Sequence, residues 1–444
     1  MIYGGDVADD WYRLFHSESL NQLVRTALAN NPDLEAARHG LMAAQYELKA
    51  VSGSELPQLD LTGQVGRAHI NGSFLYSPVD AVTVTGNRFA LGPTLAYNLD
   101  AFGGTRRAVE AQRAATATVR DQALNTYVTL VDQTVITAFD YAATQAQIEV
   151  TRELIDELQA QYDLTRTLEN AGKIIRSDTL LAQTQLENLR ATLPALQQQR
   201  EVYRNALAQL SGQSPDQFTL PPLSLRDFTL PQQLPLSLPS TLVRQRPDVL
   251  AAEDSLHQAS AAIGVATAAR FPELSLTGQY AQQTSDTRDF FTRAGGIWSF
   301  GLNATQPLFH GGTLAARQHE AEQRYQESLA SYRSTVNGAF VEVTNALQAL
   351  QHDAEGYAAH STALEAARAA SDLAREQFRA GKYTELQVLT AEQQYQQAAL
   401  TQVQADVLRF TDTATLFRAL GGGWWSAPHD PVALAAAPSG EKHD

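Results

Sequence analysis

The chain has 444 residues and a formal net charge of -15, from 33 basic and 48 acidic side chains. This acidic balance argues against nucleic acid as the main partner, because phosphate binding needs a basic surface. The absence of cysteine excludes disulfides, zinc-thiolate sites and thiol catalysis.

The beginning of the chain carries no recognisable export signal. Residues 1–12 (MIYGGDVADDWY) lack the apolar core of a signal peptide, so we expect that an exported protein would need a targeting segment that this sequence does not contain. No run of about 18 apolar residues occurs, and we therefore expect no transmembrane helix.

The sequence repeats itself at an offset close to 210 residues. LPQLDLTGQ at residues 56–64 returns as FPELSLTGQ at residues 271–279. FGGT at residues 102–105 returns as HGGT at residues 310–313, and a third block that contains Ala-Gly-Lys returns at an offset of 209. Three blocks in the same order indicate a duplicated unit.

Each copy is predicted to begin with a helix followed by two strands. Pro-Asp pairs start helices at about residues 33–54 and 248–270. Strict alternation of apolar and polar residues then predicts strands with one apolar face, at about residues 57–70, 89–101, 272–283 and 297–309. This length suits a tilted strand of an outer membrane barrel, although a hairpin in a soluble sandwich has the same pattern.

Glycine pairs mark the point where alternation gives way to heptads in both copies. After the second pair, apolar residues from Leu329 to Leu350 follow spacings of three and four, which predicts a coiled-coil seam. Residues 313–378 contain no proline, enough for about 100 Å of helix. Each long helix is predicted to turn at an Ala-Gly-Lys corner into a returning helix, from about residue 177 to 210 or from 384 to 420.

These elements divide the chain into four parts. The first repeat is expected at residues 1–213, a proline-rich connector at 214–246, the second repeat at 247–420 and a C-terminal tail at 421–444. Four strands cannot close a barrel, and open edges in lipid leave unsatisfied backbone groups. Three chains would give twelve strands and a lumen, whereas the eight strands of a dimer would fill their interior with side chains.

The chain resembles the TolC-like outer membrane factor family, and within it the OprM/NodT-type efflux channels, which are usually lipoproteins. The resemblance covers about residues 11–420. It is carried by the order and duplication of short motifs: WYRLF (11–15), NNPDLEAAR (30–38), RPDVLAAE (246–253), RFPELSLTGQY (270–280), QPLFHGG (306–312) and the two AGK corners.

The resemblance implies an α+β membrane protein: a trimeric twelve-stranded outer-membrane β-barrel with four strands per chain, continued by a long α-helical coiled-coil tunnel in the periplasm. It implies the outer membrane channel of a tripartite efflux system, a passive exit duct for drugs or other small toxic compounds. The implied partners are two further copies of the chain, a periplasmic adaptor, an inner-membrane pump and outer-membrane lipid, with no cofactor. Because this sequence has no cysteine, it leaves open whether the natural chain is acylated or is anchored by its barrel alone.

The resemblance also implies a periplasmic gate at the helix corners. Family members commonly carry aspartates just after the second corner, where this chain has the uncharged Gln387 and Thr390. Three acidic residues lie around these positions and complete the predicted constriction: Glu385, Glu392 and, on the equivalent turn of the first copy, Asp178. The competing interpretation is that the acidic residues stabilise the helix dipole at solvated helix starts.

Three further sets of residues complete the predicted sites. Adaptor contacts are expected at the corner residues Gly172, Lys173, Arg176, Gly381 and Lys382. Arg166 and Arg375, which occupy matching places before the corners, are candidates for locking the closed tip through ion pairs between subunits, and a plain surface role is the alternative. The junction of barrel and tunnel is expected at Gly103, Gly104, Gly311 and Gly312.

The sequence contains no catalytic or metal-binding motif, and we expect neither an enzyme nor a metal site. Two other functions stay open. One is type I secretion of proteins, which uses the same fold. The other is a soluble coiled-coil scaffold whose hairpins act as caps. The sequence specifies neither the cargo, nor the pump and adaptor, nor the resting state of the gate.

Overall fold

The computed structural model of the chain describes residues 2–3, 7–71, 83–231, 235–236, 245–286, 288, 290, 292 and 295–433. It forms two compact units. One contains residues 1–40, 120–250 and 334–444, and the other contains residues 41–119 and 251–333. Each unit takes segments from both repeats, so the compact units cut across the predicted division of the chain into repeats.

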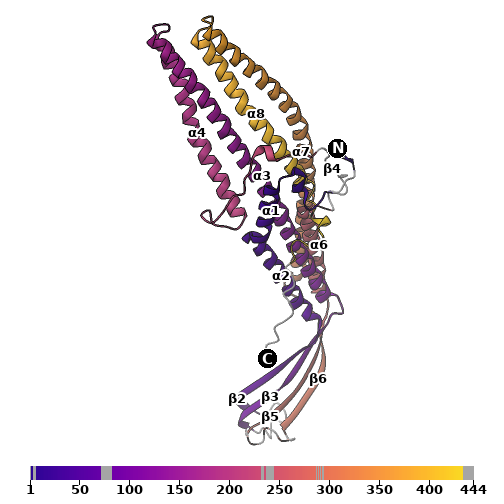
Figure 1. Cartoon of the computed structure of the whole chain (residues 1–444). Helices are drawn as coiled ribbons and strands as arrows, with labels where there is room; N and C mark the ends of the chain where they lie inside the picture. The colour runs from indigo at the N-terminus through magenta and orange to yellow at the C-terminus, as the bar shows by residue number, and fades with distance from the viewer. Residues whose placement is uncertain are drawn as a thin grey trace. The chain divides into compact units, whose positions relative to one another are not determined.

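The second unit contains a four-stranded antiparallel sheet in the order β2-β3-β5-β6 (Figure 1). The strands are β2 (Gln58–Asn71), β3 (Thr83–Leu99), β5 (Glu273–Thr284) and β6 (Gly296–Thr305). All four lie where alternation predicts them, with two corrections. β3 begins at Thr83, because it pairs with β2 over a longer stretch than alternation shows. β6 ends at Thr305 rather than at 309, just before Gln306 and Pro307, and proline has no backbone N–H to donate.

The sheet register brings the apolar residues of all four strands onto one face. Leu59 lies opposite Leu95, Leu95 opposite Gly278, and Gly278 opposite Phe300. Because side chains alternate between faces, this row fixes every second residue of each strand on the same face. Gly92 allows the close approach of β3 to β5, because a Cβ there would lie 1.9 Å from the Tyr280 carbonyl oxygen.

The helices repeat in length as well as in order. The long helices α3 (Gly104–Asn170) and α7 (Thr313–Arg379) have 67 residues each. The returning helices α4 (Arg176–Leu210) and α8 (Glu385–Ala419) have 35 each. The helices before the strands are α2 (Pro32–Ser52) and α6 (Pro247–Ala268). These bounds agree with the predicted helices to within a few residues.

The core of the first unit is aromatic and joins the N-terminal segment to α3 and α8. The segment comprises a short 3-10 helix (Trp11–Phe15) and helix α1 (Glu18–Asn30). Phe15 packs edge-on against Phe139 of α3 at 4.9 Å, and Trp11 stacks on Phe417 of α8 at 5.0 Å. This unit also contains a parallel pair of β1 (Ile2–Tyr3) and β4 (Pro235–Leu236), which the sequence did not predict.

The RPD motif anchors the start of α6. The buried Arg246 guanidinium donates two hydrogen bonds to the Asp248 carboxylate, at 3.0 and 2.7 Å, and one to the Ala419 carbonyl at 3.1 Å. The start of the second repeat is thereby tied to the end of α8. None of the helices described is both long and apolar enough to cross a membrane.

Candidate functional sites at the helix corners and the strands

The two helix corners have the same backbone and lie at the same end of the first unit's helices (Figure 1). Gly172 and Gly381 both adopt left-handed backbone conformations, with φ of 69° and 72°. The N–H groups of Lys173 and Lys382 each donate to the carbonyl five residues earlier, at 2.9 Å. This Schellman arrangement satisfies the last carbonyls of α3 and α7 and explains why glycine occupies each corner.

Both corners are positively charged and partly apolar at their surfaces. Lys173, Arg176 and Lys382 are exposed, as an adaptor contact would require. The adaptor contact itself stays a prediction. Ile175 and Leu386 are also exposed beside them. This apolar component was not predicted, although the isoleucine pair in NAGKIIRSD (residues 170–178) is a visible signal for it.

The two uncharged residues of the predicted constriction are exposed on α8. The Gln387 side-chain oxygen accepts a hydrogen bond from the Thr384 N–H at 2.8 Å, which caps the start of the helix. The Thr390 hydroxyl donates to the Leu386 carbonyl within α8. Both residues therefore present neutral side chains at this surface, and their place at a constriction stays a prediction.

Glu385 does not flank an open surface, which corrects its predicted place. Its side chain is buried, and the Gln161 side-chain amide of α3 donates to both carboxylate oxygens, at 3.1 and 2.9 Å. Burial raises the pKa of Glu385 to about 7, and the charges of Glu392 and Asp178 contribute in the same direction. Asp178 itself is half-buried in the first turn of α4.

Glu392 and Arg375 form a second buried contact, within a single chain. The Arg375 guanidinium donates to Glu392 of α8 at 2.9 Å and to Glu157 of α3 at 2.5 Å. Arg375 therefore pairs within the chain and is not a plain surface residue, and its predicted locking role between subunits stays a prediction, as does the place of the buried Glu392 at the constriction. Burial raises the pKa of Glu392 more than the Arg375 charge lowers it. Arg166 is exposed, and no ion pair joins it to another residue in the described part of the chain.

The predicted glycine junctions lie where the strands meet the long helices in the second unit. Gly103, Gly311 and Gly312 have left-handed φ values of 81°, 57° and 83°, so these turns need glycine. The backbone at Gly104 does not require glycine, because its φ is not left-handed. Glycine there instead makes room for Ala268, whose Cβ would lie 3.2 Å from a Cβ at position 104. The predicted change of direction at the glycine pairs is thus present in the backbone.

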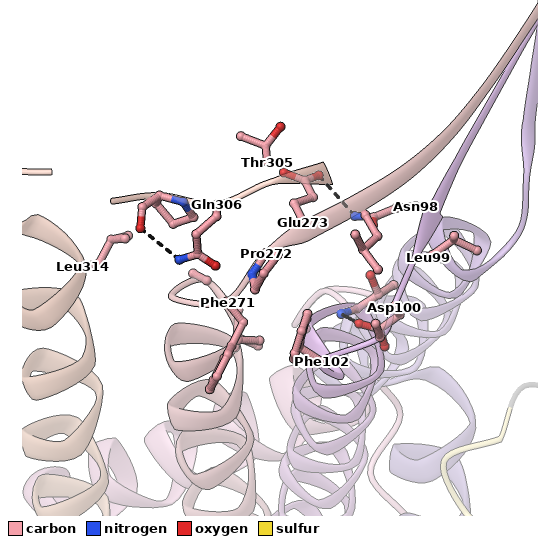
Figure 2. A pocket seen from close by; sticks show the side chains of 18 of the residues that line it. Asn98, Leu99, Asp100, Phe102, Phe271, Pro272, Glu273, Thr305, Gln306 and Leu314 are labelled. Atoms are coloured by element: carbon pink, nitrogen blue, oxygen red, sulfur yellow. Dashed lines mark hydrogen bonds between the residues drawn. The ribbon is translucent and has the colours of Figure 1, made fainter. Parts of the chain in front are cut away.

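A cavity of about 900 Å³ lies at these junctions (Figure 2). Its walls include the stacked rings of Phe102 and Phe271, 5.0 Å apart, and the apolar segment around Leu308. The Asp100 carboxylate accepts from the N–H groups of Thr105 and Arg106 and caps the start of α3. At the first junction, the Asp100 carboxylate is therefore hydrogen-bonded and the Phe102 ring is packed against Phe271 within the chain.

The apolar face of the sheet is exposed along both edge strands. Its largest exposed members are Leu59, Leu61 and Val65 on β2 and Trp298, Phe300 and Leu302 on β6. A continuous exposed apolar surface marks a contact with membrane or with another protein. Among the described residues, no group of three or more His, Cys, Asp or Glu side chains has the geometry to hold a metal ion.

Comparison with known proteins gives one consistent result. A family model described as outer membrane efflux protein matches residues 23–213 and 238–422. The probable efflux pump outer membrane protein TtgC of Pseudomonas putida is 29% identical over 416 residues, which cover 94% of this chain and 85% of that protein. The cation efflux system protein CusC of Escherichia coli is 28% identical, with coverage of 93% and 88%. The solved outer-membrane channel OprN superposes with a TM-score of 0.90 at 29% identity, over 95% of this chain and 94% of that one.

Proposed function

Because the chain belongs to the outer membrane efflux protein family, we propose that three copies form a passive exit duct, which receives its cargo from an inner-membrane pump through a periplasmic adaptor. The family assignment confirms the predicted resemblance, the fold class and the outer membrane location. It also confirms the role of an efflux channel. The family is one of channel and transport proteins.

One observation carries the proposal of a trimer. The sheet has a continuous apolar face and two edge strands, β2 and β6, which among the described residues each have a hydrogen-bonded neighbour on one side only. An isolated sheet of this kind is unstable in lipid, because its edge N–H and C=O groups find no water to bind. Closing the edges with further copies satisfies them, and twelve strands leave a lumen.

The helix corners are proposed as the adaptor contact and the gate. Lys173, Arg176 and Lys382 supply positive charge, and Ile175 and Leu386 supply apolar surface. Gln387 and Thr390 are exposed on the same stretch of α8 and are proposed to narrow the closed pore without an acidic ring.

The cargo is proposed to be small toxic compounds. The relatives carry names that refer to antibiotic efflux, toluene efflux, cation efflux and pyoverdine export. Such variety among chains of one fold supports a duct whose cargo is chosen by its pump. Export of proteins is the competing function within the same fold.

Complementation tests this function. The chain, fused to an export signal, is expressed in a strain that lacks its outer membrane factor, and resistance is scored against drugs, dyes and metals. We expect restored resistance to small compounds and a detergent-extracted trimer. Rescue of protein secretion alone would favour the type I channel, and a soluble protein would favour the scaffold.

Matched substitutions test whether the apolar face meets lipid. Phe300→Lys places a charge on that face and is expected to destabilise the barrel by about 2–4 kcal/mol if it lies near the bilayer centre. Its neighbour Ser299 points to the opposite face, and Ser299→Lys is expected to leave insertion intact. Equal amounts of both variants in the outer membrane would contradict the proposed orientation.

A further inference from the structure

A pocket of about 610 Å³ lies between the start of α3 and the end of α6, within the second unit. The residues that line it include Phe102, Arg106, Arg107 and Glu110 beside α3 and Phe271 beside α6. Its other lining residues are uncharged, so the lining carries two positive charges and one negative charge. A phosphodiester carries a single negative charge, and the pocket is therefore complementary to it.

Contacts within the chain hold both arginine side chains in place. The Arg106 Nε group donates to the Asp100 carboxylate at 3.0 Å, and the Arg107 Nη1 group donates to Glu110 at 2.6 Å. The Arg107 stem lies against Gly264, where a Cβ would come within 2.8 Å of it. A guanidinium has five N–H donors, and the bonds found in the described part of the chain leave donors free on both side chains.

The pocket meets an apolar cavity at the aromatic stack. Phe102, Ala268 and Phe271 line both the pocket and the cavity of about 900 Å³ (Figure 2). Leu99 and Leu274 also line the cavity, and they lie opposite one another at the end of the sheet's apolar face. The apolar cavity is therefore continuous with the face that is proposed to meet lipid.

The groups follow one another in the order that a lipid leaflet has. From β3 into α3, the apolar face ends at Leu99, the aromatic Phe102 follows, and Arg106 and Arg107 come next. In a leaflet, acyl chains give way to an interface that favours aromatic rings and then to phosphates. Because the helices lie in the periplasm, the matching leaflet is the periplasmic one, which consists of glycerophospholipids.

We propose that this pocket binds the phosphate of a glycerophospholipid of the periplasmic leaflet, with Arg106 and Arg107 as donors and an acyl chain in the apolar cavity. The planar guanidinium group suits the oxygens of a phosphate better than other cationic side chains do. The site goes beyond the proposed duct, because it fastens the second unit to the membrane and takes no part in conduction.

The equivalent helix start in the second repeat shows that the duplicated fold does not require these arginines. α7 follows the same glycine turn but has Leu314 and Ala315 at the positions of Arg106 and Arg107. Basic side chains in the first turn of a helix oppose its dipole, so helix stability does not account for them. A phosphate ligand does account for them, and it predicts one such lipid site per chain.

Native mass spectrometry of the full-length trimer tests this site. The protein is purified in detergent, stripped of lipid and titrated with dioleoyl phosphatidylglycerol or dioleoyl phosphatidylethanolamine. We expect one saturable site per chain for both lipids, because both carry the phosphate. The double variant Arg106→Gln with Arg107→Gln should bind them at least about tenfold more weakly, since the charge-assisted hydrogen bonds to phosphate are lost.

A matched control removes a third arginine from the same helix. Arg113 is exposed on α3 and does not line the pocket, so Arg113→Gln should keep the affinity. Dioleoylglycerol, which lacks the phosphate, should bind at least about tenfold more weakly than either phospholipid. The variant Arg106→Lys with Arg107→Lys keeps the charge and should bind better than the glutamine variant. It replaces the glutamine variant if that one does not assemble.

Two probes identify the occupant of the pocket. Inorganic phosphate that binds as tightly as the phospholipids would reduce the pocket to an anion site and overturn the lipid assignment. A photoreactive p-benzoylphenylalanine placed at Thr267, which lines the pocket, should form a lipid adduct in the outer membrane. A cross-link to another chain instead would show that a second copy covers the pocket and would overturn the inference.

Failure of the lipid site and failure of the proposed duct are distinguishable. Equal phospholipid affinity in the glutamine variant and in Arg113→Gln overturns the lipid site, whatever the complementation assay shows. Loss of resistance by the unchanged protein contradicts the duct, whether or not the purified trimer binds lipid.

Discussion

The two helix corners share a backbone and differ in the side chains that hold them. Both turn at a left-handed glycine with the same hydrogen bonds, between helices of equal length. At the second corner, Glu385 and Arg375 bind α3 through buried polar contacts. Their equivalents at the first corner are Arg176 and Arg166, which are both exposed.

Both copies of the duplicated unit keep the glycine turn and the helix lengths, whereas the buried polar contacts are found at the second corner. The turn and the helix lengths follow from the glycine and from the repeated sequence, so both copies retain them. The buried contacts need Glu157 and Gln161 of α3, and the repeat places Ala366 and Ala370 at the equivalent positions of α7. Of the two corners, the second is therefore the one tied to α3 by these residues, through Glu385 of α8 and Arg375 of α7. Movement of α8 away from α3 has to break the contact between Glu385 and Gln161, and movement of α7 away from α3 has to break the one between Arg375 and Glu157.

Loss of Arg375 should produce the largest difference between the corners. Arg375→Ala leaves Glu392, whose side chain is only 1% exposed, without its ion pair. Removing one partner of a buried pair costs roughly 3–5 kcal/mol. We expect faster amide hydrogen exchange over the first turns of α8 and leakage of antibiotics that the closed channel excludes.

The matched control for this change is Arg166→Ala at the equivalent position of the first corner. Because Arg166 is exposed, its removal should change the free energy of local unfolding by less than about 0.5 kcal/mol. Similar exchange rates in the two variants would show that the buried cluster does not hold the second corner.

The second corner should also respond to pH through Glu385. Burial raises the folded pKa of this group to about 7, above its ordinary value near 4.3. The folded corner then holds a proton that the unfolded chain releases, so stability is greatest below about pH 4 and falls as the pH rises towards 7. The loss amounts to something on the order of 3 kcal/mol.

Glu385→Gln tests this pH dependence, because an amide cannot ionise and still accepts a hydrogen bond from Gln161. Its melting temperature should vary less between pH 4.5 and 8 than that of the unchanged protein. Asp178→Asn removes a charge that helps to raise the pKa of Glu385, so this variant should keep the pH dependence but move the loss of stability to slightly lower pH. A profile unchanged by Glu385→Gln would exclude Glu385 as the titrating group.

Substitution of each corner glycine tests whether the two glycine turns contribute equally to the free energy of unfolding. Gly172→Ala and Gly381→Ala each force a Cβ into a left-handed conformation, and no other atom lies close enough for an added clash. Backbone strain alone should cost about 1–2 kcal/mol in both variants. Unequal losses in the free energy of unfolding would mean that the corners differ in backbone as well as in side chains.

The corners also show which features were predictable from sequence. Glycine, proline and the repeat predicted the turns, and the absence of proline predicted the long helices, because these signals act within a few residues. The strands were predicted from alternation for the same reason. The burial of Glu385 depends on Gln161, more than 200 residues earlier, and no local pattern contains that contact. Arg375 was recognised as important, but its partners on α3 and α8 become visible only when the helices are packed.

The smallest predicted effect comes from the helix start itself. At the second corner Thr384 and Gln387 form a cap, whereas Ile175 occupies the position of Thr384 at the first corner and makes no side-chain cap. Ile175→Thr should therefore stabilise the start of α4 by about 0.5–1 kcal/mol, since Ile175 is exposed and loses little apolar burial. Gln387→Ala should weaken the start of α8 by a similar amount. Slower hydrogen exchange at the first corner together with faster exchange at the second would establish that the cap is one of the differences between them. If neither variant changes exchange, the difference lies entirely in the buried contacts to α3.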